Sequence, residues 1–359
     1  MNKLILLAHF PKMTVHRYRG LRNAFPNVEE SWQAQAGDFK NSGWEDDLVG
    51  EFLRWRDKLD IEKTQKILDQ EQIHCVTMAD PEYPPLLKEI YDPPFCLFVR
   101  GDLDNLAFPL AVVGPRKHSQ YGEQVTREIV ASLAARGICI VSGLALGIDG
   151  LAHQTALQAG GRTVAVLGCG NDKYHIQPAA HRLLANQIIE AGGAVITEYP
   201  PGTVPNTFTF PRRNRIIAGL TLGTLVIEAS ESSGSLITAQ CALDNGREVF
   251  AVPQNITSET ATGANNLLKM GARLVTSHQD ILDALNLHDI KQYVTSRDIV
   301  PDSPAEAALI SYLSREPVHI DQLIKQSTLD SPTVNSTLTL MEMKGRARNI
   351  GGMMYVLAR

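Results

Sequence analysis

The middle of the chain alternates short apolar runs with amphipathic segments. Seven runs rich in β-branched residues predict strands, at residues 110–114, 138–142, 163–168, 194–198, 224–229, 248–253 and 273–276. Segments with helical spacing separate them, near residues 121–136, 149–159, 178–191, 211–220, 234–245 and 263–270. Strands that alternate with helices in this way predict right-handed β-α-β crossovers and a mainly parallel sheet covered on both faces, an α/β fold.

The flanking regions have different patterns. Residues 1 to about 80 are predicted to be mostly helical, with Trp32, Trp44 and Trp55 as packing residues, and a Pro-rich connector follows at residues 80–94. After a predicted linker at residues 300–304, the last part of the chain indicates three helices and a β-hairpin that turns at Gly351-Gly352, the pattern of a winged helix. We therefore expect a helical domain at 1–80, an α/β domain at 81–290 and a winged-helix domain at 300–359.

Charge is distributed unevenly along the 359 residues, whose formal net charge is −5. Residues 111–220 hold ten Lys and Arg against six Asp and Glu, which indicates an anionic partner for the middle of the chain. The five cysteines are scattered and form no C-x-x-C pair, so neither a disulfide framework nor a zinc site is expected. Neither a signal peptide nor a membrane span is indicated, and we expect a cytoplasmic protein.

Glycine, serine and basic residues gather in the loops that follow the predicted strands. In an open parallel sheet, ligands bind beyond the carboxyl ends of the strands, so these loops share one edge. Ser142-Gly143 and Gly234-Ser235 each open a helix, where free N–H groups favour an anion. Arg116 and Lys173, in neighbouring loops, add positive charge. Several phosphate sites in a row predict a polynucleotide backbone better than a single nucleotide.

The segment Phe210-Pro-Arg-Arg-Asn-Arg places its cations at an unfavourable end of a helix. Pro211 suits the first helical position, and Ile216, Ile217 and Leu220 form an apolar stripe. The arginines Arg212, Arg213 and Arg215 then fall where the helix dipole is positive, at a cost of about 0.3–1 kcal/mol each. An anion or a carboxylate partner is the simplest explanation, and for Arg212 both DNA and a salt bridge to Glu198 or Glu228 remain open.

The same loops have other interpretations. Each glycine taken alone is equally well a tight turn, and Ser235 an N-cap. Glu198 and Glu228 end adjacent strands, and we interpret them as structural salt-bridge partners rather than a catalytic pair. His153 is expected to pack or hydrogen-bond. Gly168-Cys-Gly170 lacks the third glycine of a dinucleotide-binding loop, since Lys173 occupies its position.

Taken together, these motifs resemble the DNA-processing protein A family (DprA, also called Smf). The resemblance is carried by Val113-Gly-Pro-Arg, Val141-Ser-Gly-Leu-Ala-Leu-Gly-Ile-Asp, Phe210-Pro-Arg-Arg-Asn-Arg-Ile-Ile-Ala-Gly-Leu, Ser233-Gly-Ser-Leu-Ile-Thr-Ala and Gly246-Arg-Glu-Val-Phe-Ala-Val-Pro. It covers roughly residues 75–285. The N-terminal helices stand where the family has a sterile-alpha-motif-like or helix-hairpin-helix-like domain, and the C-terminal part looks like the winged helix of many members. Pro115, His175 and Gln254 depart from the family pattern.

The resemblance implies an extended Rossmann-like domain that binds single-stranded DNA. It also implies a homodimer that loads the RecA recombinase onto incoming strands during natural transformation, with no cofactor and no catalytic step. By position, its basic pocket corresponds to Arg116, Lys173, Arg213, Asn214 and Arg215. Its backbone contacts correspond to Ser142, Gly143 and Ser235.

Two alternatives compete with a single-strand binder. A nucleotide phosphoribohydrolase has a related layout, but Glu231-Ser-Ser-Gly-Ser-Leu-Ile-Thr lacks the paired glycines and the catalytic glutamate of that motif. A winged helix that reads duplex DNA is the other alternative, but residues 331–343 contain no Lys or Arg. Tyr174, His175 and Phe210 are candidate stacking platforms for bases.

Overall fold

A computed structural model describes residues 2–104, 106–287, 303–313, 318–327, 329–343, 347–349 and 351–357. The chain divides into two compact units, Met1–Ile290 and Lys291–Arg359. The predicted linker lies mostly outside the described residues. In the described part of the chain, no helix is long and apolar enough to cross a membrane.

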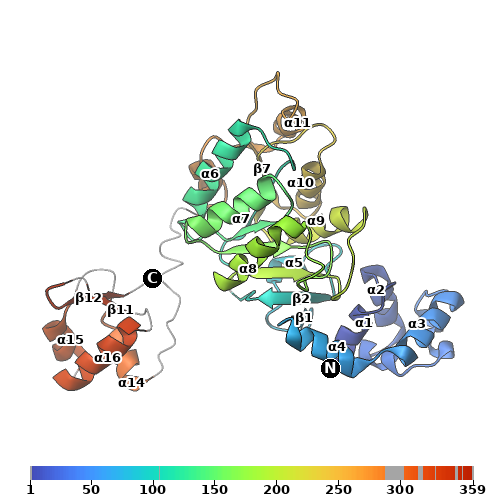
Figure 1. Ribbon diagram of the computed structural model, residues 1–359, viewed down its shortest axis with the longest axis horizontal. Helices are drawn as coiled ribbons and strands as arrows, with labels where there is room; N and C mark the ends of the chain where they lie inside the picture. Colours follow the sequence, from blue (N-terminus) through green and yellow to red (C-terminus); the bar gives the residue numbers. More distant parts are fainter. Residues whose placement is uncertain are drawn as a thin grey trace. The chain divides into compact units, whose positions relative to one another are not determined.

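The larger unit is built on one mixed sheet (Figure 1). Its nine described strands are β1 (His74–Thr77), β2 (Cys96–Gly101), β3 (Leu110–Val113), β4 (Ile140–Ser142), β5 (Thr163–Val166), β6 (Ala194–Thr197), β7 (Gly223–Val226), β8 (Glu248–Ala251) and β9 (Arg273–Leu274). Their order is β1-β2-β6-β5-β4-β3-β7-β8-β9. The strands from β3 to β9 pair in parallel, while β1 and β2 pair antiparallel at one end. The prediction of a mainly parallel sheet with seven strands is confirmed, and β1 and β2 extend it.

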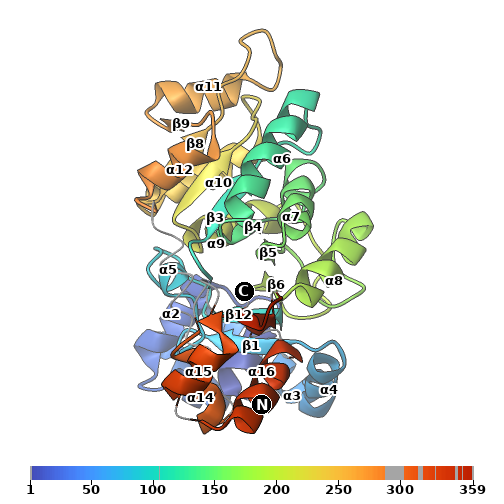
Figure 2. The ribbon, with the colours of Figure 1, turned by 90° about the vertical axis from the view of Figure 1, so that its left-hand side faces the viewer.

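Helices cover both faces of this sheet. They are α5 (Pro85–Lys88), α6 (Gln120–Ala134), α7 (Ile148–Gln158), η3 (Ala179–His181), α8 (Arg182–Glu190), α9 (Thr209–Gly219), α10 (Gly234–Asp244), α11 (Thr262–Lys269) and α12 (His278–Ala284). Successive strand residues point to opposite faces, so Val164 and Val166 share a core with α5, α9, α10 and α11. Ala165 packs with α8 on the other face, where α6, α7 and α12 also pack (Figure 2).

The N-terminal helices pack on the antiparallel end of the sheet. They are α1 (Lys3–Ala8), α2 (Val15–Ala24), α3 (Asp46–Lys58) and α4 (Ile61–Gln70), with two 3-10 turns, η1 (Val28–Trp32) and η2 (Ala36–Asn41). Their core includes Trp44 and, at its margin, Trp32 and Trp55, as the sequence predicts. The same core continues onto Cys96 and Phe98 of β2, so the helices and the sheet share buried surface.

The smaller unit is a winged helix. It consists of α14 (Pro304–Ile310), β10 (Val318–His319), α15 (Ile320–Ser327), α16 (Ser331–Met343), β11 (Ala347–Asn349) and β12 (Met354–Leu357). The strand order is β10-β12-β11, and Gly351 and Gly352 both have positive φ in the turn before β12. The three helices and the hairpin of the prediction are confirmed. Of the basic residues near the wing, those at positions 344 and 346 lie outside the described residues, and position 348 is described only as part of β11.

Candidate nucleic-acid interface

The loops that carry the sequence motifs lie at the carboxyl edge of the parallel strands. From β3 the chain first builds β4, β5 and β6 on one side, then crosses back to build β7, β8 and β9 on the other. The topological switch point therefore lies between β3 and β7, which pair directly. In open α/β sheets, a ligand normally enters the crevice at this point.

A carboxylate of the chain itself closes that crevice. Glu228, just after β7, is fully buried. Its carboxylate accepts hydrogen bonds from the Ser119 backbone N–H, at 3.0 Å, and from the Ser119 hydroxyl. Ser119 is the N-cap of α6, so the Glu228 carboxylate stands where a phosphate binds at a helix N-terminus. A Cβ at Gly122 would come within 2.6 Å of the Glu228 carboxyl carbon, so this glycine leaves room for it. The prediction that Glu228 forms a salt bridge with an arginine is wrong, since Ser119 and Thr260 hold it.

The second loop is satisfied internally. The Ser142 hydroxyl is buried and donates to the Val112 carbonyl oxygen at 2.6 Å. The Gly143 N–H donates to Asp149 Oδ2 at 3.1 Å. The sequence predicted free donors for a phosphate at both residues. That expectation is wrong for this structure, because the Val112 carbonyl oxygen takes the Ser142 hydroxyl and the carboxylate of Asp149, six residues after Gly143, takes the Gly143 N–H.

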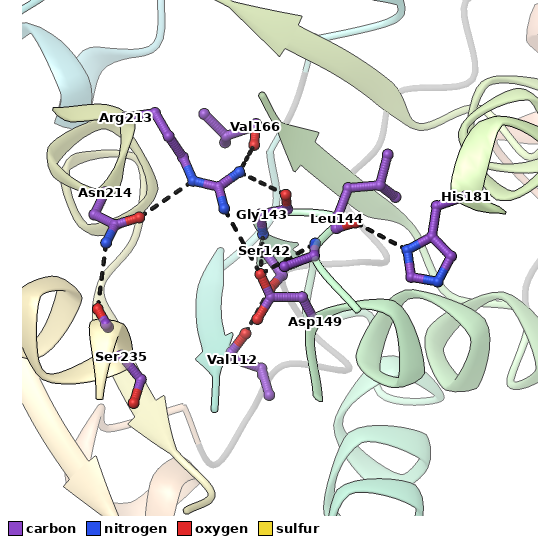
Figure 3. Close-up of polar contacts among 12 residues, drawn as sticks. Val112, Ser142, Gly143, Leu144, Asp149, Val166, His181, Arg213, Asn214 and Ser235 are labelled. Carbon is purple, nitrogen blue, oxygen red and sulfur yellow. Dashed lines mark hydrogen bonds and ion pairs between the residues drawn. The ribbon is translucent and has the colours of Figure 1, made fainter. Parts of the chain in front are cut away.

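Arg213 lies at the centre of the same buried network (Figure 3). Its side chain is only 7% exposed, and its guanidinium donates to the carbonyl oxygens of Gly143, at 2.5 Å, and of Val166. Its Nη2 is 3.9 Å from Asp149 Oδ2. Burial lowers the pKa of Arg213 and raises that of Asp149, while each charge opposes the shift of the other. We call Ser142, Gly143, Asp149 and Arg213 the buried network.

The helix that carries Arg213 begins earlier than its sequence predicts. Asn206 Oδ1 accepts the N–H groups of Phe208 and Thr209, at 2.9 and 3.1 Å, and α9 starts at Thr209. Pro211 is therefore the third helical residue. A backbone N–H at this position has no acceptor within the helix, so a proline, which lacks the N–H, costs no hydrogen bond there. The arginines follow Pro211 and lie mostly beyond the first turn, so the dipole penalty is smaller than the sequence suggested.

Glu198 pairs with the other two arginines of α9. Arg215 is largely buried, with Nη2 at 2.5 Å from Glu198 Oε2 and Nε at 3.5 Å from Asp92 Oδ2. Arg212 keeps 35% of its side chain exposed and lies 3.7 Å from Glu198 Oε1. The prediction that Glu198 is a structural salt-bridge partner is confirmed. Of the three arginines, Arg212 is the one with a side chain accessible to a ligand.

Two more cations of the predicted site are exposed. Arg116, in the loop after β3, lies with its guanidinium carbon 5.7 Å from the centroid of the Phe210 ring. Lys173, in the loop after β5, also faces solvent, and its backbone N–H donates to Glu71 Oε2 at 2.9 Å. We call Arg116, Lys173 and Arg212 the exposed cations.

The N-terminus of α10 is hydrogen-bonded to α9 through Asn214, and its first residue, Gly234, is exposed to solvent. Ser233 is its N-cap, and the Ser233 and Ser235 hydroxyls lie 2.7 Å apart. Ser235 is mostly buried, whereas Gly234 is exposed with nothing within 4 Å of the position of a Cβ. The Asn214 amide donates to the Gly234 carbonyl oxygen at 3.4 Å and accepts from Arg213, which links this helix start to the buried network. The N-cap is thus Ser233 rather than Ser235.

Aromatic side chains next to the exposed cations face solvent. Phe208, at the N-cap of α9, is 82% exposed, and Tyr174, beside Lys173, is 71% exposed. Tyr174 was predicted as a stacking platform but Phe208 was not, because nothing in the sequence pattern distinguishes Phe208 from a core residue. His153 is fully buried with Nδ1 2.7 Å from Thr163 Oγ1, so the expectation of packing and hydrogen bonding is confirmed. In the described ranges, no group of three or more His, Cys, Asp or Glu side chains is placed to hold a metal ion.

Comparisons with known proteins agree with this architecture. The family described as DNA recombination-mediator protein A matches residues 74–286, more than half of the chain. This chain belongs to the DNA-processing protein A (DprA/Smf) family. The DprA winged helix domain matches residues 295–353. Protein Smf of Escherichia coli is 42% identical over 292 residues, which cover 79% of this chain and 78% of that protein.

Solved DprA structures have the same fold. The X-ray structure of DprA from Streptococcus pneumoniae aligns with a TM-score of 0.68 at 37% identity, covering 79% of this chain and 97% of that chain. A structure of DprA from Helicobacter pylori, described for its single-stranded DNA binding mode, aligns with a TM-score of 0.53 at 28% identity. It covers 60% of this chain and 98% of that chain.

Proposed function

We propose that this DprA-family chain binds single-stranded DNA along the carboxyl edge of its sheet. The observation that carries the proposal is the set of exposed cations, two of which stand beside exposed aromatic rings in the chain: Lys173 precedes Tyr174, and Arg212 follows Phe208 by four residues. Arg116, Lys173 and Arg212 supply charge for phosphates, and Phe208 and Tyr174 supply rings for bases. Cations that follow a backbone combined with rings on which bases stack are typical of proteins that bind single strands.

The buried network has a different part in this proposal. Arg213 and Asn214 support the loops from below, because their polar groups are directed to carbonyls and a carboxylate inside the protein. Direct phosphate contact is assigned to the exposed cations and to the open start of α10 at Gly234. Ser142, Gly143, Arg215 and Ser235 then contribute by shaping the edge rather than by touching DNA.

The wider role follows from the family. We propose that the bound strand is handed to the RecA recombinase during natural transformation, that the chain acts as a cytoplasmic homodimer, and that it catalyses no reaction of its own. Glu228 supports the absence of nucleotide chemistry at the switch point, since its carboxylate repels a phosphate there. Release of free base from nucleoside monophosphates would contradict the non-enzymatic part of the proposal.

Binding of fluorescent oligo-dT at two salt concentrations tests the proposal. Phosphate contacts release counterions, so the logarithm of the affinity for a single strand falls with the logarithm of salt with a slope of about −0.7 per contact. We expect steep salt dependence and a preference for single strands over duplex. Affinity that is insensitive to salt, or equal for the two forms, would contradict it. RecA filament formation on the same oligonucleotide, with and without the chain, tests the loading step.

A further inference from the structure

A tyrosine in the connector between α5 and β2 is held rigidly in solvent. Tyr91 is 83% exposed, and the Arg19 guanidinium carbon of α2 lies 5.1 Å from the centroid of its ring. Its backbone is fixed from two sides: the carbonyl oxygen accepts from Arg19, and the N–H donates to Asn245 Oδ1 at 3.2 Å. An exposed apolar group is common on protein surfaces. Here two other segments hold the backbone of Tyr91, so the place of its ring on the surface is fixed.

The surface around this ring is positively charged. Arg19, Arg22 and Lys88 are exposed or half-exposed, and no carboxylate in the described part of the chain pairs with them. The neighbouring acids have partners of their own: Glu89 pairs with Arg247 at 3.0 Å, and Asp92 pairs with Arg215 at 3.5 Å. Asp244, next to Asn245, accepts a hydrogen bond from the Gln240 amide at 2.8 Å. Helix α2 carries arginines but no acidic residue. A fixed ring among unpaired cations is suited to an anionic ligand that also has aromatic groups.

Helix α9 connects this surface to the exposed cations. Arg215 reaches Asp92, the residue after Tyr91, and Arg212 lies on the neighbouring turn of the same helix face. Further along α9, a Cβ at Gly219 would overlap Ile90 at 2.8 Å, so the helix packs closely on the connector. Figures 1 and 2 both show α2, α5 and α9 side by side. Ion pairs from Asp92 to Arg215, from Arg215 to Glu198 and from Glu198 to Arg212 thus join the connector that carries Tyr91 to the exposed cations.

We propose that Tyr91, Arg19 and Arg22 form a second contact site for the DNA strand that the exposed cations hold. A base stacks on the free face of the Tyr91 ring, and the arginines of α2 contact phosphates. This inference rests on the proposed function, since the strand enters from the carboxyl edge of the sheet. It assigns to the N-terminal helices a role in lengthening the bound segment of DNA.

Oligonucleotides of two lengths test the inference. The full chain and its Tyr91→Ala and Arg19→Ala/Arg22→Ala variants are titrated with oligo-dT of ~6 and ~20 nucleotides. The first length lies near the short end of the roughly 4–16 nucleotides that a single module covers, and the second exceeds that range. We expect each variant to bind the long oligonucleotide at least about fivefold more weakly and the short one within about twofold of the unaltered chain. The arginine variant also flattens the salt slope for the long oligonucleotide by about 1.4.

Matched controls make the outcomes distinct. Tyr91→Phe keeps the ring and is expected to bind as the unaltered chain does, and Lys63→Ala/Lys66→Ala removes two cations from α4 and leaves both affinities unchanged. If the unaltered chain fails to bind the short oligonucleotide, the proposed function is wrong. If it binds both lengths and the variants lose no affinity for the long one, the second site is wrong. Equal loss for both lengths, or an affinity change for a protein partner alone, also overturns it.

Discussion

The buried network and the exposed cations lie on the same sheet edge and use the same residue types differently. Arg213 has 7% of its side chain exposed and donates to backbone carbonyls beside the Asp149 carboxylate. Arg212, its neighbour in sequence, is 35% exposed and lies 3.7 Å from Glu198. One step along a helix turns a side chain by about 100° and changes its environment from protein to solvent. A basic motif in a nucleic-acid-binding protein therefore does not by itself identify the residues that contact phosphate.

The largest difference between the two groups is expected in stability. Arg213→Ala leaves Asp149 buried without its counter-charge and removes the donors of two carbonyls, so we expect the free energy of unfolding to fall by about 3–5 kcal/mol. Urea denaturation measures it. Arg116→Ala is the matched control, with an expected change within about 0.5 kcal/mol. Equal effects of the two variants would contradict the distinction.

A methyl group inside the buried network should have an intermediate effect. A Cβ at Gly143 would overlap the Arg213 guanidinium, which carbonyls and a carboxylate hold in place. We expect Gly143→Ala to lower the free energy of unfolding by about 1–3 kcal/mol, as overpacking does. Gly234→Ala, with open space around its Cβ position, should lower it by much less. A stable Gly143→Ala variant would show that the guanidinium moves freely.

The histidine next to this network should make stability depend on pH. Burial, assisted by His181 and Arg213, lowers the pKa of His153 to about 3 from an ordinary value near 6.5. Between these values the unfolded chain binds the proton that the folded chain excludes. Stability is therefore full above about pH 6.5 and falls as the pH drops towards 3, by up to about 1.4 kcal/mol per pH unit.

A variant isolates this contribution. Replacing the buried imidazole by His153→Gln is expected to flatten the dependence of the unfolding free energy on pH in that window, whatever its cost in stability. His16→Gln, on the exposed face of α2, serves as the control and should leave the dependence unchanged. A slope that is the same in both variants would show that other groups cause the acid sensitivity.

The smallest effect on DNA binding is expected from the winged helix. The exposed face of α16 carries Asn335, Ser336 and Thr339, and the helix has no basic residue to contact phosphate. We expect that deleting residues 300–359 changes the affinity for single strands less than twofold, measured by the same titration. A collapse of binding in the truncated chain would instead assign the DNA contact to the smaller unit.

The fold was largely predictable, because buried parallel strands are continuous apolar runs. Strands β1 and β2 were not predicted, since each lies next to a proline-rich connector and pairs with distant residues. The edge that carries the site was predictable from the loops. The distribution of its arginines was not predicted, although a signal exists: Arg213 precedes Ile216, Ile217 and Leu220 by three, four and seven residues, which places it on the apolar stripe.

Other features of the site depend on contacts between distant segments. The Asp149 carboxylate accepts the Gly143 N–H across the loop between them. Glu228, which follows β7, accepts the Ser119 N–H at the N-terminus of α6. Neither pairing has a fixed spacing in sequence. From the sequence alone, a loop or helix start whose N–H groups are taken by a carboxylate of the chain therefore looks the same as a free anion site.

The salt dependence of oligo-dT binding by the combined variant Arg116→Ala/Lys173→Ala/Arg212→Ala tests most directly whether the exposed cations contact phosphate. All three side chains reach solvent, so the variant should keep the thermal stability of the unaltered chain. With three phosphate contacts removed, we expect weaker binding and a salt slope shallower by about 2. An unchanged salt slope in a folded variant would contradict the assignment of phosphate contacts to the exposed cations and would indicate that other residues of the edge contact the phosphates.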